Sequence, residues 1–503
     1  MVLFIANRGE IALRVVRTAA ELDIRTVAVY AADDADSAHV HAADVATALP
    51  GTGPAAYLNE DAMVAAATAA GATLVHPGYG FLSERASFAR ACGAAGLTFV
   101  GASPAVLETF GDKAAARAMA VGAGVPVLAA TGAATLDEVS EFFTAHPHGV
   151  MIKALAGGGG RGMRVVRSAA DVTEAYRICA AEAQLGFGSD AVYAEQLLES
   201  ARHIEVQIVA DGTTAVAIGD RDCSLQRRHQ KLVEIAPAQQ VPDDLRAALH
   251  SAAATLCAQA GLVGVATVEF LVSGERYYFL EVNPRLQVEH TVTEEVTGLD
   301  LVAIQLALAE AAGVDELGLP PGISATTGTV SGSLASARGI AIQARVNMET
   351  MAPDGTPVPS AGTLPPGRTS TMSPTRSSDG ATISVSSPTT RSTSSGSRAA
   401  SESSAEVVCA SDRISIQWPS SIITISRASS HQKSSWWCNR PRLAPHEDTN
   451  ATVMASPMSS IIPGARERIS LTAPVRNGLP PHAYITVPSS GDTHCAPGNA
   501  GTV

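Results

Sequence analysis

The chain has 503 residues, of which 46% are hydrophobic and 17% charged, a composition typical of a folded globular protein rather than of a disordered or fibrous one. Its net charge of −13 does not provide the dominant basic surface of a nucleic-acid-binding protein, so we expect no nucleic-acid partner. Its apolar runs fall short of the ~18 residues that a bilayer-spanning helix requires, so we expect no membrane association.

The N-terminal segment and the cysteines predict a protein of the reducing cytoplasm. Residues 1–9 are apolar but lack the basic region and the cleavage site of a signal peptide, so a buried first β-strand is the better interpretation. The seven cysteines are scattered, odd in number and without a CxxC pair, which argues against a disulfide framework and a zinc site. We therefore expect a cytoplasmic location.

Strand and helix signals alternate over residues 1–100 and predict a parallel sheet covered by helices. The expected strands are residues 2–6, 26–30, 73–76 and 98–100, and the expected helices are residues 10–22 and 62–70. Ligands of such sheets bind at the carboxyl ends of the strands, so the turns after Ala6 and His76 are candidate site loops.

A glycine run at residues 157–162 follows a helical stretch at 101–127 and lies inside a small unit over 128–200. Strands are expected at 150–155, 163–167 and 192–196, with a helix near 171–183. Because a strand follows the glycines, the run predicts a hairpin flap whose backbone N–H groups wrap a polyphosphate, and not a dinucleotide-binding turn. An ordinary glycine-rich hairpin explains the run equally well. Lys113 and Lys153 could supply charge to phosphates, although a lone lysine is more often merely solvated.

From residue 201 to about 364 we expect mainly strands, at 203–210, 214–219, 265–271 and 277–282, and an amphipathic helix at 300–312. The run from Arg221 to Lys231 holds three cations and a histidine within five residues. This density predicts either an anion site or an exposed basic loop.

Two carboxylates lie inside predicted buried strands, where an unpaired charge is costly. Glu281 and Asn283 are two residues apart and so face the same side of a strand, with Glu269 expected on a neighbouring strand. Such oxygen donors suit Mg²⁺ that bridges ATP phosphates, or the carboxylates pair with arginines. Beyond them Arg285, Gln287 and Glu289 alternate on one predicted face, a trio that could bind and deprotonate a small oxyanion.

The composition changes near residue 365. Residues 365–435 are rich in Ser and Thr with little apolar periodicity, and Lys433 is the one lysine after Lys231. A natural low-complexity tail is one interpretation. We favour a frameshift or an erroneous join near residue 365, because the local pattern no longer agrees with the preceding fold.

Residues 1 to about 364 resemble the biotin carboxylase family, the ATP-grasp component of acetyl-CoA, propionyl-CoA and pyruvate carboxylases. The segments that carry the resemblance are IANRGEIALR (5–14), HPGYGFLSE (76–84), GDK (111–113), IKALAGGGGRGM (152–163), RHIEVQI (202–208), RDCSLQRRHQK (221–231), VEFL (268–271), FLEVNPRLQVEH (279–290) and AIQARVN (341–347). The resemblance implies an α/β protein with a Rossmann-like N-terminal domain (1–110), an ATP-grasp domain (111–315) with a lid subdomain (about 128–197), and the start of a C-terminal domain (316–364). Residues 365–503 would form an aberrant or disordered tail.

The resemblance also implies the site residues. Those that would hold ATP are Lys113, Lys153, Gly157, Gly158, Gly159, Gly160, Gly162, Glu195, Leu198, His203, Gln226 and His229. Glu269, Glu281 and Asn283 would bind Mg²⁺ or Mn²⁺. Bicarbonate would lie among Lys231, Arg285, Gln287 and Val288, with Glu289 as its base. Arg345 would stabilise the biotin enolate, while Tyr79 and Gly80 would receive the biotin ring.

The activity so implied is that of a ligase. Bicarbonate attacks the γ-phosphate of ATP, the resulting carboxyphosphate decomposes, and biotin N1′ is carboxylated. The chain has no Ala-Met-Lys-Met turn, so biotin would arrive on a separate carrier protein and leave for a carboxyltransferase subunit. An acyl-CoA carboxylase role, in fatty acid biosynthesis, and a homodimer are the corresponding expectations.

The sequence departs from the family at two places. Gln196 stands where many members have a lysine, which places one adenine contact in doubt. The similarity ends near Leu364, whereas a complete lobe continues for about 80 residues more. Two alternatives therefore stay open, namely an inactive ATP-binding fragment and another ATP-grasp ligase such as a carbamoyl-phosphate-synthase-like unit.

Overall fold

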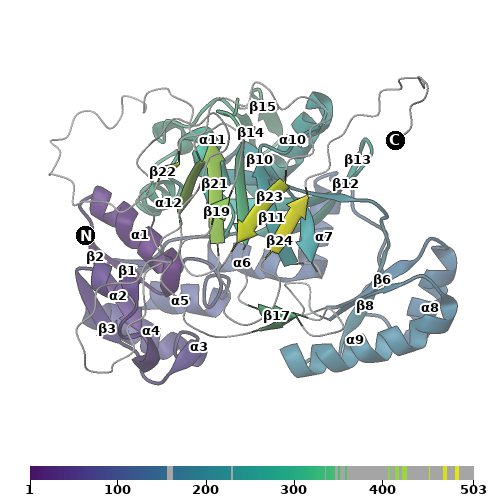
Figure 1. The fold of residues 1–503 in the computed structure, drawn as a ribbon, viewed down its shortest axis with the longest axis horizontal. Coiled ribbons are helices and arrows are strands. Elements are labelled where there is room, and N and C mark those ends of the chain that lie inside the picture. The colour runs from purple at the N-terminus through teal and green to yellow at the C-terminus, as the bar shows by residue number, and fades with distance from the viewer. Residues whose placement is uncertain are drawn as a thin grey trace, which may run out of the picture. The chain divides into compact units, whose positions relative to one another are not determined.

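The computed structural model describes residues 1–155, 162–227, 230–334 and 336–345, together with short strands between residues 349 and 486 (Figure 1). The chain divides into two units, one of residues 1–347 and 419–424 and one of residues 348–418 and 425–503. All predicted site residues that the structure describes lie in the first unit.

The N-terminal part of the first unit is a parallel sheet of five strands in the order β3-β2-β1-β4-β5. The strands are β1 (Val2–Ile5), β2 (Arg25–Tyr30), β3 (Val45–Ala48), β4 (Leu74–His76) and β5 (Thr98–Phe99). The helices are α1 (Gly9–Glu21), α2 (Ala38–Ala42), α3 (Gly53–Ala56), α4 (Glu60–Ala69) and α5 (Ala86–Ala94). Leu3 and Ile5 join one apolar cluster and Phe4 joins another, so both faces of β1 are buried, as the continuous apolar run predicts.

The larger sheet of the first unit is antiparallel and carries most of the candidate site. Its described order runs β13-β12-β9-β10-β11-β16, and β14 and β15 extend from β10. The strands are β9 (Arg202–Asp211), β10 (Thr214–Arg227), β11 (Gln230–Ala236), β12 (Val263–Ser273), β13 (Arg276–Asn283), β14 (Ile323–Thr326), β15 (Thr329–Ser331) and β16 (Ala341–Arg345). The associated helices are α6 (Pro104–Gly111), α7 (Lys113–Gly122), α10 (Asp243–Gln259), α11 (His290–Thr297) and α12 (Leu301–Ala309).

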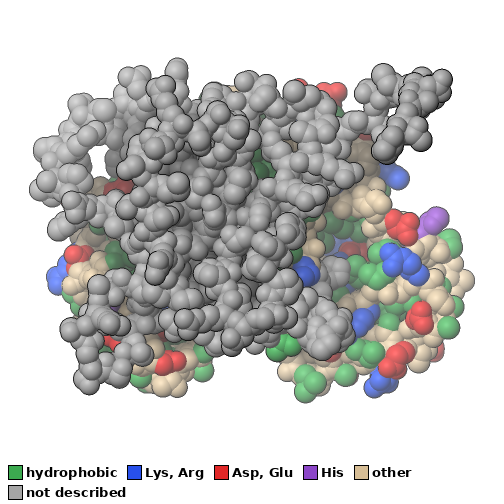
Figure 2. Space-filling model, viewed as in Figure 1, with side chains coloured by type: hydrophobic (Ala, Val, Ile, Leu, Met, Phe, Trp, Pro, Cys, Tyr) green, Lys and Arg blue, Asp and Glu red, His purple; other side chains and the backbone are tan. Residues whose placement is uncertain are grey.

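A smaller subdomain has its own sheet and its own core. β6 (Val150–Ala154) pairs with β7 (Met163–Val166) and with β8 (Val192–Gln196), and both pairings are antiparallel. α8 (Leu136–Ala145) and α9 (Val172–Phe187) pack on this sheet through a separate apolar cluster that includes Val139, Ile152 and Cys179. The predicted hairpin around the glycine run is therefore confirmed. Figure 2 shows basic and acidic side chains mixed over this subdomain, in agreement with the exposed pairs Arg164–Glu182 and Arg177–Glu174.

Two local predictions are wrong. The strand expected at 214–219 is found but continues to Arg227, so its predicted end is wrong; of the basic run, Arg221 and Arg227 lie on β10 and Lys231 lies on the paired strand β11, while residues 228 and 229 lie outside the described part. β13 ends at Asn283, so Arg285, Gln287 and Glu289 do not alternate along a strand. Pro284 has no N–H for a ladder hydrogen bond, which explains why the strand ends there.

The described elements of the second unit are short strands. β17 (Glu349–Met351) pairs with β18 (Pro357–Pro359), β23 (Arg468–Thr472) lies between β19 (Glu406–Val407) and β24 (His482–Thr486), and β20 (Ile414–Gln417) pairs with β22 (Thr452–Val453). β21 (Ile422–Arg427) belongs partly to each unit. The other residues from 360 onward lie outside the described part, so the predicted tail stays a prediction.

Among the helices that the structure describes, none combines the length and the apolar character of a bilayer-spanning segment.

Candidate active site

Two carboxylates and an amide meet on adjacent strands, as the sequence predicts. Glu269 of β12 is the register partner of Glu281 on β13. The Asn283 amide nitrogen donates to Glu269 Oε1 at 2.8 Å and to Glu281 Oε1 at 3.2 Å, so the three side chains face one point. The two carboxylates supply hard oxygen ligands that fit a divalent cation such as Mg²⁺, and the Asn283 oxygen, which accepts from Arg285 Nη2, would join them once the amide turns.

The two carboxylates differ in their electrostatic surroundings. Burial raises the pKa of Glu281, and the negative charge of Glu269 raises it further. Burial also tends to raise the pKa of Glu269, but the positive charges of Lys231 and His203 hold that pKa well below its usual value. A cation beside Glu281 would stabilise the negative charge of its carboxylate, so the residues present fit a metal ion.

Lys231, on β11, touches carboxylates from three other parts of the chain. Its ammonium group forms an ion pair with Glu205, and its Nζ lies 2.8 Å from Glu289 Oε1 and 3.1 Å from Glu269 Oε1. Burial would lower the pKa of Lys231, but these carboxylates raise it well above its ordinary value. Lys231 is therefore a charged group that joins the metal-binding candidates to the predicted base.

Glu289 directly precedes α11 and carries a strongly held negative charge. Arg345 Nη2 donates to Glu289 Oε2 at 2.9 Å, and Arg345 Nε donates to Glu234 Oε1 at 2.6 Å. Burial would raise the pKa of Glu289, yet Lys231, Arg345 and Arg221 lower it to about 2. An anion that drew Lys231 and Arg345 away would raise this pKa again.

The segment between β13 and α11 turns its polar side chains toward this cluster although it is not a strand. Arg285 Nη2 donates to Asn283 Oδ1 at 3.0 Å, and the Gln287 amide nitrogen donates to Glu269 Oε1 at 2.9 Å. Val288 is half-buried in the same segment. The predicted bicarbonate residues are thus brought together, by a different local structure from the one expected.

Some of the predicted ATP residues form a second group at the smaller subdomain. Lys153 of β6 is paired with Glu195 of β8, and Lys113 Nζ donates to the Leu155 carbonyl oxygen at 3.2 Å. Burial would lower the pKa of Lys153, but Glu195 raises it above its ordinary value. Glu281 is close enough to contribute to the pKa of both lysines, so the lid group and the metal-binding candidates are electrostatically connected.

Other predicted ATP residues are split between the described and undescribed parts. His203 Nε2 lies 2.6 Å from Glu269 Oε2, and the Gln226 amide lies 2.8 Å from His203 Nδ1. Leu198 is half-buried just after β8. Gly162 has a φ of +69°, and a Cβ there would lie 3.0 Å from that of Ala154. Gly157, Gly158, Gly159, Gly160 and His229 lie outside the described residues.

The turn after β4 is held tightly by its neighbours. The Asn7 amide donates to the carbonyl oxygens of Pro77 at 2.7 Å and Tyr79 at 2.9 Å, and the Gly78 N–H donates to His76 Nδ1 at 3.0 Å. Gly80 is exposed with a φ of +68°. Glu84, just beyond, lies 3.1 Å from Arg285 Nε, so this turn adjoins the segment that carries the predicted bicarbonate residues.

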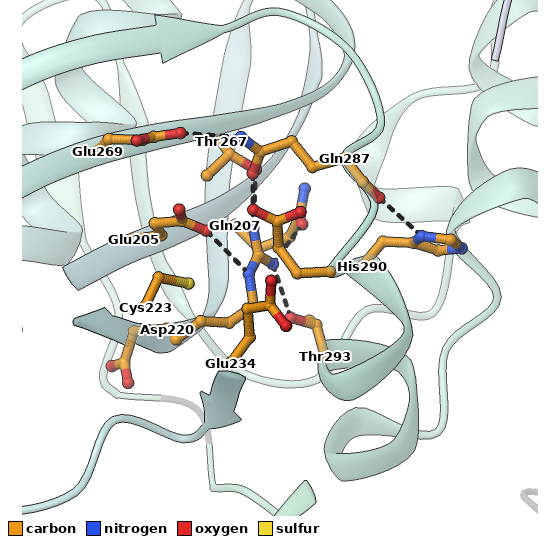
Figure 3. A network of polar contacts seen from close by, with 12 residues as sticks. Glu205, Gln207, Asp220, Cys223, Glu234, Thr267, Glu269, Gln287, His290 and Thr293 are labelled. Atoms are coloured by element: carbon orange, nitrogen blue, oxygen red, sulfur yellow. Dashed lines mark hydrogen bonds and ion pairs between the residues drawn. The ribbon is translucent and has the colours of Figure 1, made fainter. Parts of the chain in front are cut away.

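Sequence reasoning missed several polar residues that complete the cluster. Glu205 and Gln207 of β9, Thr267 of β12, and Glu234 of β11 are fully buried, and Figure 3 shows these four side chains in one cluster. A signal existed, because His203, Glu205 and Gln207 alternate through an otherwise apolar strand and so must share a face.

Comparison with known proteins agrees with this geometry. The family model described as "Biotin carboxylase, N-terminal domain" matches residues 1–107, and "Carbamoyl-phosphate synthase L chain, ATP binding domain" matches residues 112–317. A solved biotin carboxylase from Campylobacter jejuni, in complex with an ATP analogue, is 31% identical, with 84% of this chain and 86% of that chain covered and a TM-score of 0.67. This chain belongs to the biotin carboxylase family. It therefore has the N-terminal and ATP-grasp domains of that family in an α/β fold.

Other biotin carboxylase relatives are larger proteins. Pyruvate carboxylase of Bacillus subtilis is 46% identical over 314 residues, with 61% of this chain and 27% of that protein covered, and human mitochondrial pyruvate carboxylase is 48% identical over 324 residues, with 63% and 27% covered. A single-chain, multi-domain long-chain acyl-CoA carboxylase of known structure is 56% identical, with 73% of this chain and 34% of that chain covered and a TM-score of 0.64. The chain thus spans little more than a quarter of the length of the curated relatives that it matches.

Proposed function

We propose that this chain carboxylates biotin with ATP and bicarbonate, through carboxyphosphate. The observation that carries the proposal is the position of Lys231, whose ammonium contacts both Glu269, a metal-binding candidate, and Glu289, the candidate base. A cation between these two carboxylates is suited to hold an anionic nucleophile beside a metal-bound triphosphate. The biotin would be attached to a carrier protein outside these 503 residues.

In the proposed reaction, Lys231, Arg285 and Gln287 bind bicarbonate while Glu289 accepts its proton. The bicarbonate oxygen forms a bond to the γ-phosphorus as the bond to ADP breaks. Mg²⁺, when bound by Glu269, Glu281 and Asn283, would supply charge neutralisation of the phosphates. Lys113 and Lys153 would hold the phosphate oxygens, and the glycine run at 157–162 would contribute backbone N–H donors.

The low pKa of Glu289 is consistent with a base that becomes active only when its substrate binds. Lys231 and Arg345 lower this pKa through their positive charges. Once Lys231 turns to bicarbonate and Arg345 turns to the biotin enolate oxygen, less positive charge acts on Glu289 and its pKa rises. The carboxylate then accepts a proton more readily, at the moment when bicarbonate is in place.

We infer that the final acceptor is an acyl-CoA. The support is the higher identity with the long-chain acyl-CoA carboxylase, 56%, than with the pyruvate carboxylases of Bacillus subtilis and human, 46% and 48%. A carboxyltransferase and a biotin carrier would be the partners, with a homodimer as the assembly and the cytoplasm as the location. A biotin-carrier assay with acyl-CoA and with pyruvate tests the choice of acceptor, and transfer to pyruvate alone would contradict it.

The test of the proposed reaction is bicarbonate-dependent ADP release by the purified chain in the presence of Mg²⁺ and free biotin. Glu289→Gln and Lys231→Gln should each lower turnover by about 10²–10⁴-fold, the usual contribution of a general base or a charged clamp. Glu174→Gln is the matched control, because Glu174 is exposed on α9 and pairs with Arg177 alone among described residues. ATP binding without turnover would favour an inactive fragment, and biotin-independent turnover with an ammonia donor would favour another ATP-grasp ligase.

A further inference from the structure

Arg221 is the most deeply buried large side chain of the candidate site. It lies on β10, has no exposed surface, and donates to acceptors from other elements. Its Nε donates to Glu205 at 3.2 Å. Nη1 donates to Gln207 at 2.7 Å and Thr293 at 2.8 Å, and Nη2 donates to Thr267 at 2.9 Å and Gln287 at 3.0 Å.

These contacts use the whole hydrogen-bonding capacity of the guanidinium group. Arginine has five N–H donors in a fixed plane, and each of them has an acceptor within the described residues. A group in this state has no donor left for a substrate. Arg221 is therefore suited to hold other side chains in place and not to bind bicarbonate or phosphate itself.

The side chain that matters most in this network is Gln287. An amide can point its oxygen or its nitrogen toward the metal-binding candidates, and the two orientations have opposite polarity. Arg221 takes the Gln287 oxygen, so the Gln287 nitrogen must face Glu269, to which it donates at 2.9 Å. Arg221 thereby holds Gln287 with its amide N–H donors toward the site, and an anion requires such donors.

The same guanidinium fixes Glu205. Glu205 Oε2 accepts from Arg221 while Glu205 Oε1 pairs with Lys231, so one carboxylate joins the two cations. A displaced Glu205 would change the position of the Lys231 ammonium. Arg221 thus contacts Gln287 directly and reaches Lys231 through Glu205.

The opposite face of β10 keeps Arg221 from moving. The neighbouring residue, Asp220, faces α10, and its carboxylate accepts from Arg246 and from His250 Nε2 at 2.8 Å on that helix and from the Ala238 N–H at 2.8 Å in the segment before it. Successive side chains of a strand point to opposite faces, so a strand fixed through Asp220 also fixes the base of Arg221.

We propose that Arg221 is the positioning residue of the bicarbonate pocket, which orients the Gln287 amide and the Glu205 carboxylate without touching substrate. The proposal rests on the proposed function, since it assigns a role within that pocket.

Arg221→Lys tests the proposal, because lysine keeps the charge but cannot reach five acceptors. We expect the KM for bicarbonate to rise by about 10–100-fold, the usual effect of a group that orients a ligand-binding side chain, with the Kd for MgATP unchanged. The exposed Arg177→Lys is the matched control. Thr293→Val, which removes one acceptor and no charge, should raise the same KM by a smaller factor. It provides a second test of the proposal if Arg221→Lys folds poorly.

A double-mutant cycle separates positioning from general stability. If Arg221 acts through Gln287, then Arg221→Lys combined with Gln287→Ala should lose no more than the worse single variant. Additive losses in the double variant, or a parallel loss of MgATP binding, would overturn the positioning role of Arg221. The proposed function would still hold in that case, provided that the unmodified chain shows bicarbonate-dependent turnover. An unmodified chain without such turnover would overturn the proposed function itself.

Discussion

His76 connects the N-terminal sheet to the larger sheet's helices through one imidazole ring. Its Nδ1 accepts from the Gly78 N–H, and its Nε2 lies 3.2 Å from Gln305 Oε1 on α12. Burial lowers the pKa of His76 to about 4, so the ring is neutral at physiological pH. The neutral form suits its partners, because Nδ1 must keep a lone pair for Gly78.

His76 should therefore make stability fall on mild acidification. Its pKa is lower in the folded than in the unfolded chain, so between pH 6.5 and 4 the unfolded state binds more protons and gains relative stability. From pH 7 to pH 5 this group removes about 1–2 kcal/mol of stability. His76→Asn, whose Oδ1 can still accept from Gly78, should show a weaker dependence of melting temperature on pH. An unchanged dependence would argue against a neutral, buried ring.

Individual site residues were predictable where a local pattern constrained them. Glu281 and Asn283 share a face because strand side chains alternate, and a buried carboxylate must find a cation, which limited its roles. The role proposed for Arg221 was not accessible in this way. An arginine in a basic run has the same sequence signature whether it is exposed or fully enclosed.

Strand β10 contacts different parts of the first unit with its two faces. The face of Arg221 supports the candidate site, and the face of Asp220 binds α10. Asp220 is 3% exposed and its partners Arg246 and His250 are also largely buried. The ion pair between Asp220 and Arg246 joins β10 to α10, which starts at Asp243, 23 residues after Asp220.

Asp220→Asn should destabilise the first unit by about 3 kcal/mol, because removing one partner leaves the Arg246 charge buried and uncompensated. Urea denaturation followed by circular dichroism measures the change. Asp61→Asn, at an exposed position of α4, should change stability by less than about 0.5 kcal/mol. Equal stability of the two variants would show that the ion pair contributes nothing.

Elements with a strong local period were predicted well, and those that depend on distant partners were not. β1, β4 and α1 follow their apolar patterns to within two residues. The continuation of β10 to Arg227 was missed because its polar side chains look like a loop until Glu205, Lys231 and Thr267 surround them. α10, alanine-rich and buried along most of its length, has too weak an amphipathic contrast to stand out.

For the whole molecule, the first unit depends on contacts between its successive domains. Arg14 of α1 contacts Glu294 of α11 at 2.9 Å and Asp300, which precedes α12, at 3.0 Å. Thr18 donates to the same aspartate at 2.8 Å. These contacts hold α1 against α11 and against the residue that precedes α12, which follow the candidate site in the chain. We therefore expect ligand binding to change the stability of the whole first unit.

MgATP should accordingly stabilise the chain against heat. A ligand that binds the folded state alone adds about 2.7 kcal/mol at 100 times its Kd. The melting temperature should rise with ATP and Mg²⁺ together, fall back when EDTA removes the metal, and rise less in Glu281→Gln. Equal stabilisation by ATP with and without Mg²⁺ would contradict the assignment of Glu269, Glu281 and Asn283.

The sequence by itself determined the family, the parallel N-terminal sheet, and the identity of the acidic and amide residues on β12 and β13. These depend on periodicity and on motifs within about ten residues. The tertiary structure alone decided that Lys231 would meet Glu205, 26 residues earlier, and that Arg221 would be enclosed by four other segments. Such pairings are set by how strands associate across the sheet, and no local pattern of residues encodes them.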